Sequence, residues 1–351
     1  MSRRPLSWFA ATALAFAACG AAAGELPCKP GEKECAFKAL VSHRAKTIAY
    51  WSPMFAKPLE QRIGAAPDAV VELIALDNLY NGYPEHPKSA RMDPKLKADV
   101  IAAFHELPRP VKARLDKRLA GIYFVADLGG TGFTDSIADA DGQKHAAFIV
   151  LDPRVLERTA NAWATWKESS PFVPDPRYRL VARIEPPETN DRRHAIQYIL
   201  LHELGHVLAV GADYHPDWNL KIADLPKDRH YPFFDLSWTV DTEGNRYLSR
   251  FEAELPERGD VRYYFGPKLP ASRMAQTYEH LEATNFPTLY AATIPGDDFA
   301  ESFASYVHVV MMGKPFEITI SEDGRVARRF GSCWGEERCA GKKKILDELL
   351  R

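Results

Sequence analysis

Two histidines and a glutamate at positions 202–206 have the spacing of a metal-binding, hydrolytic unit. The segment reads His202-Glu203-Leu204-Gly205-His206. Residues four apart on a helix project from the same face, so both imidazoles can reach one ion. Catalytic zinc takes neutral histidine nitrogens and a carboxylate oxygen, and it keeps a fourth position open for water. The metal lowers the pKa of that water, and Glu203 can take its proton as it attacks a carbonyl group.

The residues around this pentad predict a buried helix. Residues 190–210 form a long apolar stretch, with Asn190 or Asp191 as its cap and Gly211 just beyond its end. The alternative is a structural helix that buries two histidines and a glutamate without an ion. Burying such groups unpaired costs several kcal/mol. The pattern therefore favours a metal site.

A later helix, expected to begin near residue 297, carries two carboxylates that could take part in such a site. Asp297 and Glu301 are four residues apart, so they face the same way, and one can bind the metal while the other orients a ligating histidine. The apolar residues at 299–304 favour a buried helix over a solvated helix start. The residues leave open which carboxylate is the ligand.

The pentad resembles that of the zincin metallopeptidases. The metzincin subclass requires a glycine and a third histidine where this chain has Ala209 and Ala212, so that subclass is excluded. Residues 288–304 are similar to the Glu-x-Phe-Ala-Glu-x-Phe segment of lethal-factor-like and pro-pro endopeptidases, which belong to the gluzincin subclass. The resemblance covers the pentad, this later segment and the strands expected between residues 121 and 184.

This resemblance implies a role for each of three residues. Asp297 aligns with the family's metal ligand, Tyr290 with a tyrosine that faces the substrate, and Glu301 with a carboxylate behind the ligands. The family has Glu where this chain has Asp297, so the shorter side chain requires the helix to lie closer to the metal. In the other register Glu301 is the ligand, and residues 301–306 also resemble a pattern of zinc aminopeptidases.

The remaining chain predicts an α+β, zincin-like fold with a small mixed sheet formed by strands from residues 121–184, the metal-binding helix and a mainly helical C-terminal half. Helices are expected at 34–50, 68–80, 93–107, 111–119, 190–210 and 297–312, and strands at 121–126, 146–151, 178–184, 316–320 and 325–330. The glycine-rich segment 128–133 is interpreted as a loop. We expect a signal peptide at 1–24, an N-terminal helical region at 25–120 and a metallopeptidase domain at 121–351.

Composition restricts the class of protein further. The chain has 351 residues, of which 46% are hydrophobic and 26% charged, values that exclude a disordered chain. Its formal charge of −2 shows no excess of basic residues of the kind that binds nucleic acid, so no nucleic-acid partner is expected.

The N-terminus has the features of an export signal. Arg3 and Arg4 precede an apolar run at 7–18 and a small-residue cleavage site at 21–23. Cys19 lies in a near match to a lipid-attachment site, which leaves a lipid anchor open. No other run approaches transmembrane length, so we expect a secreted or periplasmic protein without a transmembrane segment in the mature chain.

Four further cysteines remain in an oxidising compartment, and they predict two disulfides. They are Cys28, Cys35, Cys333 and Cys339. Local pairing is one of three possible connectivities. Zinc ligation by these thiols is the rival interpretation, although neither spacing is the usual Cys-x₂-Cys form.

These features together predict an exported zinc metallopeptidase that acts on a peptide or protein substrate. His202 and His206 would bind Zn²⁺ with Asp297 or Glu301, Glu203 would be the general base, and Tyr290 would donate to the developing oxyanion. An exposed sheet edge could hold the peptide by strand addition. The alternatives are an inactive zinc-binding envelope or scaffold protein and an amide hydrolase that acts on cell-wall peptides.

Overall fold

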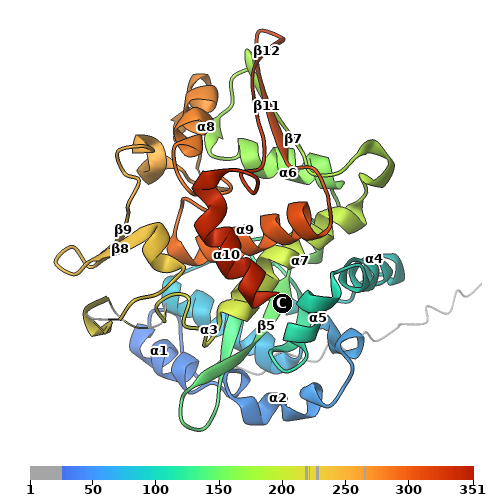
Figure 1. The fold of residues 1–351 in the computed structure, drawn as a ribbon. Helices are drawn as coiled ribbons and strands as arrows, with labels where there is room; N and C mark the ends of the chain where they lie inside the picture. Colours follow the sequence, from blue (N-terminus) through green and yellow to red (C-terminus); the bar gives the residue numbers. More distant parts are fainter. Residues whose placement is uncertain (1–25, 218–219, 221, 227–228, 265) are drawn as a thin grey trace, which may run out of the picture.

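A computed structural model of the protein describes residues 26–351, except 218–219, 221, 227–228 and 265. The described part has an α+β fold (Figure 1). Its α-helices are α1 (Lys33–Val41), α2 (Ile48–Phe55), α3 (Asp68–Asn81), α4 (Pro94–His105), α5 (Arg109–Leu115), α6 (Ala160–Ser169), α7 (Arg192–Ala209), α8 (Met274–Glu282), α9 (Pro295–Tyr306) and α10 (Ala340–Leu349).

The strands form one central sheet and three smaller sheets. The central sheet contains β1 (Ile63–Ala65), β2 (Lys88–Ser89), β3 (Leu119–Ala126), β4 (Gly132–Ala138) and β5 (Lys144–Leu151). The smaller sheets contain β6 (Phe172–Val173) with β10 (Leu269–Pro270), β7 (Tyr178–Arg183) with β11 (Glu317–Glu322) and β12 (Arg325–Phe330), and β8 (Trp238–Asp241) with β9 (Arg246–Ser249).

The central sheet is buried on both faces. Strands β1, β3 and β5 are parallel, and β4 runs antiparallel at one edge. Alternate side chains of β5 enter different cores, because Phe148 packs with α3 on one face and Ile149 packs with α4 and α7 on the other. Parallel strands covered by helices on both faces produce such continuous apolar runs. The sheet thereby places α7 on one face, with α1–α3 on the opposite face (Figure 1).

The edge strand β4 was not predicted. Its first residues were interpreted as part of a glycine-rich loop, but residues 132–138 pair with β5 along their length. A Cβ atom on Gly132 would lie 2.5 Å from the carbonyl oxygen of Val150. The glycine therefore permits a close approach of the two strands.

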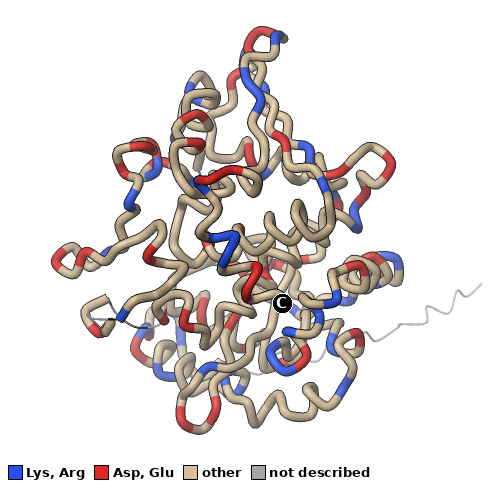
Figure 2. The backbone as a smooth tube through the Cα atoms, in the orientation of Figure 1, with Lys and Arg blue, Asp and Glu red and all other residues tan. Residues whose placement is uncertain are grey.

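Two other expectations of the sequence require correction. The helix expected at 34–50 is divided into α1 and α2, and the N-terminal region supplies β1 and β2 to the central sheet. Strand β7 lies outside the central sheet and pairs with β11. The β11–β12 hairpin projects from the molecule at the top of Figure 1. Its acidic residues lie on β11 and in the turn, and its basic residues lie on β12 (Figure 2).

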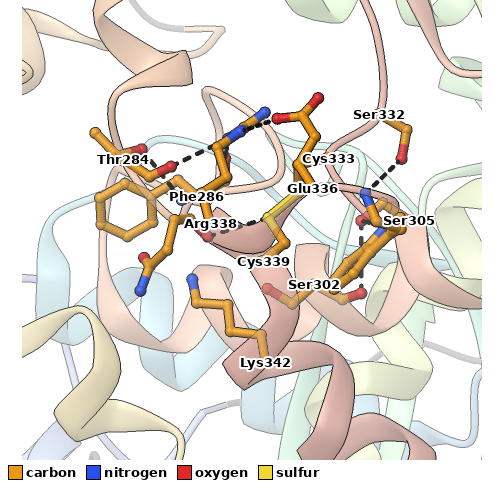
Figure 3. The surroundings of a disulfide bond; sticks show 12 residues. Thr284, Phe286, Ser302, Ser305, Ser332, Cys333, Glu336, Arg338, Cys339 and Lys342 are labelled. Carbon is orange, nitrogen blue, oxygen red and sulfur yellow. Dashed lines mark hydrogen bonds and ion pairs between the residues drawn. A yellow bond between two sulfur atoms is a disulfide. The ribbon is translucent and has the colours of Figure 1, made fainter.

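Two disulfides join neighbouring cysteines, Cys28 to Cys35 and Cys333 to Cys339. The prediction of two disulfides is confirmed, and of the three connectivities that the sequence left open the structure has the local one. The second disulfide stands at the start of α10, where Lys342 follows one turn later (Figure 3). Lys342 donates to Asp298 of α9 at 2.5 Å, and both side chains are fully buried. This contact ties α10 to the helix that carries Asp297.

No helix in the described part of the chain has the length and apolar character needed to cross a bilayer. The signal peptide expected at 1–24 and the lipid anchor considered at Cys19 both lie outside the described residues.

Candidate metal centre

Helix α7 carries both histidines of the pentad on one face. Asp191 caps the helix by accepting a hydrogen bond from the backbone N–H of His194. The Nε2 atoms of His202 and His206 lie 3.2 Å apart. Two neutral imidazoles in this position direct lone pairs toward the same point.

Helix α9 brings a carboxylate to that point. The Oδ1 atom of Asp297 lies 3.8 Å from His202 Nε2 and 3.5 Å from His206 Nε2. A tetrahedral zinc site with bonds of ~2.0–2.1 Å places its ligand atoms about 3.3 Å from one another. The three side chains therefore fit a zinc ion in both donor chemistry and spacing. They are the one group of this kind in the described chain.

A glycine–alanine contact allows α9 to approach α7 this closely. Where the two helices meet near the middle of the molecule (Figure 1), Gly205 faces Ala300. A Cβ atom on Gly205 would lie 2.7 Å from the Ala300 Cα atom. The short side chain of Asp297 requires a helix close to the histidines, and this contact provides that proximity.

Substitution of Gly205 by alanine should therefore separate the helices. Alanine normally stabilises a helix interior by about 1 kcal/mol over glycine, but overpacking here should cost about 1–3 kcal/mol. We expect a lower free energy of unfolding and weaker zinc binding, measured by urea denaturation and competition with a chelator. Gly341→Ala in α10 is the matched control, because its Cβ would meet only the side chain of Leu236, at 3.3 Å. Equal zinc affinity in both variants would contradict this account.

Glu301 lies behind the donor group rather than within it. Its Oε1 accepts from His202 Nδ1 at 2.9 Å and from Lys167 Nζ at 2.8 Å, while Thr288 donates to Oε2 at 2.9 Å. The hydrogen bond from His202 Nδ1 to Glu301 orients the imidazole so that its Nε2 atom faces Asp297. Carboxylates commonly orient metal-binding histidines in this way. Burial alone would raise the pKa of Glu301, but Lys167 and His202 outweigh it and lower the pKa to about 2.

The same contact changes the titration of His202. Burial disfavours the charged imidazole, but Glu301 outweighs burial and raises the pKa of His202. A proton on His202 would compete with a metal ion, so acid opposes metal binding at this site.

Lys167 was not predicted to take part in the site. It belongs to α6, and its Nζ lies 4.8 Å from the ring centroid of Tyr290 as well as against Glu301. Only 4% of the side chain is exposed. Lysines usually lie at the surface. Nothing in the residues around Lys167 indicates that this lysine, unlike the others, is buried beside the site.

The expected base and the expected oxyanion donor both lie beside the donor group. Glu203 is largely buried, and its Oε2 accepts from Thr134 of β4 at 2.7 Å. The ring of Tyr290 stacks on His202 with centroids 5.5 Å apart. Burial, followed by the charge of Asp297, raises the pKa of Tyr290 well above its ordinary value. The tyrosine therefore remains a hydroxyl donor at neutral pH.

Comparison with known protein families, curated proteins and solved structures found no match to this chain. What the site can do therefore follows from its own residues.

Proposed function

We propose that the protein is an exported zinc-dependent metallopeptidase with a zincin-like domain of the gluzincin type. The observation that carries the proposal is the convergence of His202 Nε2, His206 Nε2 and Asp297 Oδ1. In this proposal Asp297 is the third ligand, and Glu301 orients His202. The two disulfides are consistent with an extracytoplasmic location.

The surrounding residues suit peptide hydrolysis. A zinc ion supplies Lewis-acid activation of water and of the scissile carbonyl group. Glu203 takes a proton from the attacking water, and Thr134 holds the carboxylate in place by its hydrogen bond. The hydroxyl of Tyr290 donates a hydrogen bond to the carbonyl oxygen as negative charge develops on that oxygen. Among the described residues three protein donors meet here. A zinc site with three protein donors keeps a position for water, which favours an enzyme over a scaffold with a closed four-ligand site.

Strand β4 offers a binding surface for an extended peptide. It pairs with β5 on one side, and its other edge carries one isolated bridge between Thr47 and Ala138. Thr134 places this strand against Glu203. A peptide that adds to the free edge by main-chain hydrogen bonds would pass the candidate base.

Metal analysis and peptide profiling test the proposal together. Mature protein purified without chelator should contain about one zinc per chain. It should cleave members of a peptide library, lose activity on chelation and regain it with zinc. Metal-free protein, or zinc protein that cleaves no peptide, would overturn the proposal. Cleavage confined to cross-linked cell-wall peptides would instead support the amide hydrolase alternative.

A further inference from the structure

The last turn of α6 supports several side chains around the candidate metal centre. Lys167 contacts Glu301 and the ring of Tyr290, as described above. Glu168 accepts hydrogen bonds from the hydroxyls of Tyr263 at 2.9 Å and Tyr278 at 2.7 Å. Because both hydroxyls donate their hydrogen bonds to this buried carboxylate, we assign them a structural role.

Tyr264, the next residue, is held differently. Its backbone has a φ of 68°, a left-handed conformation that is costly for a bulky residue and that is found preferentially at functional sites. The backbone N–H donates to the hydroxyl of Ser170 at 3.1 Å, and the ring packs on Trp166 with centroids 5.1 Å apart. One contact from α6 and one from the residue that caps its C-terminal end thus fix this strained residue in one orientation.

Tyr264 lies next to Tyr290, the expected oxyanion donor. Its ring lies 6.1 Å from that of Tyr290, nearly perpendicular to it. Neither hydroxyl makes a hydrogen bond to any residue that the structure describes. Burial raises the pKa of Tyr264, and the charges of Glu301 and Glu168, followed by those of Asp297 and Glu203, raise it further. The group therefore stays protonated, and its donor is free for an acceptor that arrives with the substrate.

We propose that Tyr264 is a second catalytic tyrosine, whose hydroxyl donates a hydrogen bond to the carbonyl oxygen of the scissile peptide together with Tyr290. The inference rests on the metallopeptidase function proposed above. The bond strengthens as charge develops on that oxygen, so the hydroxyl stabilises the transition state more than the bound substrate. Tyr264 transfers no proton in this role.

The test compares Tyr264→Phe with Tyr263→Phe, each of which removes one hydroxyl and keeps the ring. Tyr264→Phe should retain zinc and its melting temperature but lose about 10²-fold in kcat with little change in KM. Its affinity for a phosphinic peptide, a mimic of the tetrahedral intermediate, should fall by a similar factor in calorimetry of the zinc protein. Tyr263→Phe should melt at a lower temperature and keep most of its kcat.

Each other outcome is decisive. If Tyr264→Phe matches the wild type in kcat and in phosphinic-peptide affinity, the catalytic role proposed for Tyr264 is wrong and the metallopeptidase proposal stands. If it loses zinc or thermal stability as its main effect, Tyr264 is a structural residue. If the wild-type protein holds zinc but neither cleaves peptides nor binds the phosphinic peptide, both proposals fail.

Discussion

Replacement of Glu203 by glutamine should lower kcat by about 10²–10⁴-fold while zinc stays bound. Glutamine has the same shape and can still accept the hydrogen bond that Thr134 donates to Glu203 Oε2 at 2.7 Å. It cannot take a proton from water. Because Glu203 lies outside the group formed by His202, His206 and Asp297, its charge is not needed to hold the metal.

Two variants separate loss of the base from loss of the site. His206→Ala removes one of the three donors and should lose zinc and activity together. Thr134→Val keeps the base but removes its hydroxyl partner, and it should lower kcat by about tenfold, as changes of an orienting partner commonly do. Zinc content from elemental analysis and kcat from peptide cleavage give the two readouts. A Glu203→Gln protein that binds zinc and retains the wild-type rate would rule out Glu203 as the base.

The sequence predicts the local parts of this site well. Helix α7 follows from its apolar run and the Asp191 cap, and the histidine spacing on it is fixed by the helical repeat. The strands expected at 316–320 and 325–330 are likewise confirmed as β11 and β12, which pair through the turn at Asp323 and Gly324. Each of these features depends on residues close together in the chain.

The parts that depend on distant contacts could not be predicted. Whether Asp297 or Glu301 faces the histidines is set by the distance between α7 and α9, and that distance depends on the Gly205–Ala300 contact. Glu301 meets Lys167 from 134 positions away. The left-handed backbone of Tyr264 is imposed by its neighbours and leaves no signal in the residue type.

Replacement of Lys167 by methionine should destabilise the fold by about 3–5 kcal/mol at neutral pH. Lys167 Nζ lies 2.8 Å from Glu301 and 3.6 Å from Glu168, and all three side chains are almost wholly buried. Without the ammonium group, two carboxylates remain close together in a medium that solvates charge poorly. Glu301 would then take up a proton more readily, and its hold on His202, with the zinc affinity that depends on it, would weaken.

A surface ion pair of the same length provides the control. Lys38 Nζ also lies 2.8 Å from a glutamate, Glu34, but both side chains are mostly exposed. Lys38→Met should therefore cost less than about 1 kcal/mol. Lys167→Met combined with Glu301→Gln should recover part of the lost stability, because the unpaired buried charge is removed. If Lys167→Met and Lys38→Met lower the free energy of unfolding equally, burial adds nothing to the stabilising effect of the Lys167 ion pair.

The pH dependence gives the sharper test of Lys167. Glu301 has a folded pKa of about 2, below its ordinary value of 4.5, so its ionised form stabilises the fold above pH 4.5. That contribution is lost as the pH falls from 4.5 toward 2. In Lys167→Met the folded pKa of Glu301 rises, because only His202 is left to lower it, and the contribution becomes smaller. The difference in unfolding free energy between the metal-free wild-type and variant proteins should therefore be largest at neutral pH and narrow below pH 4.5, as measured by urea denaturation. A difference that stays constant with pH would mean that lost packing, not lost charge, accounts for the effect.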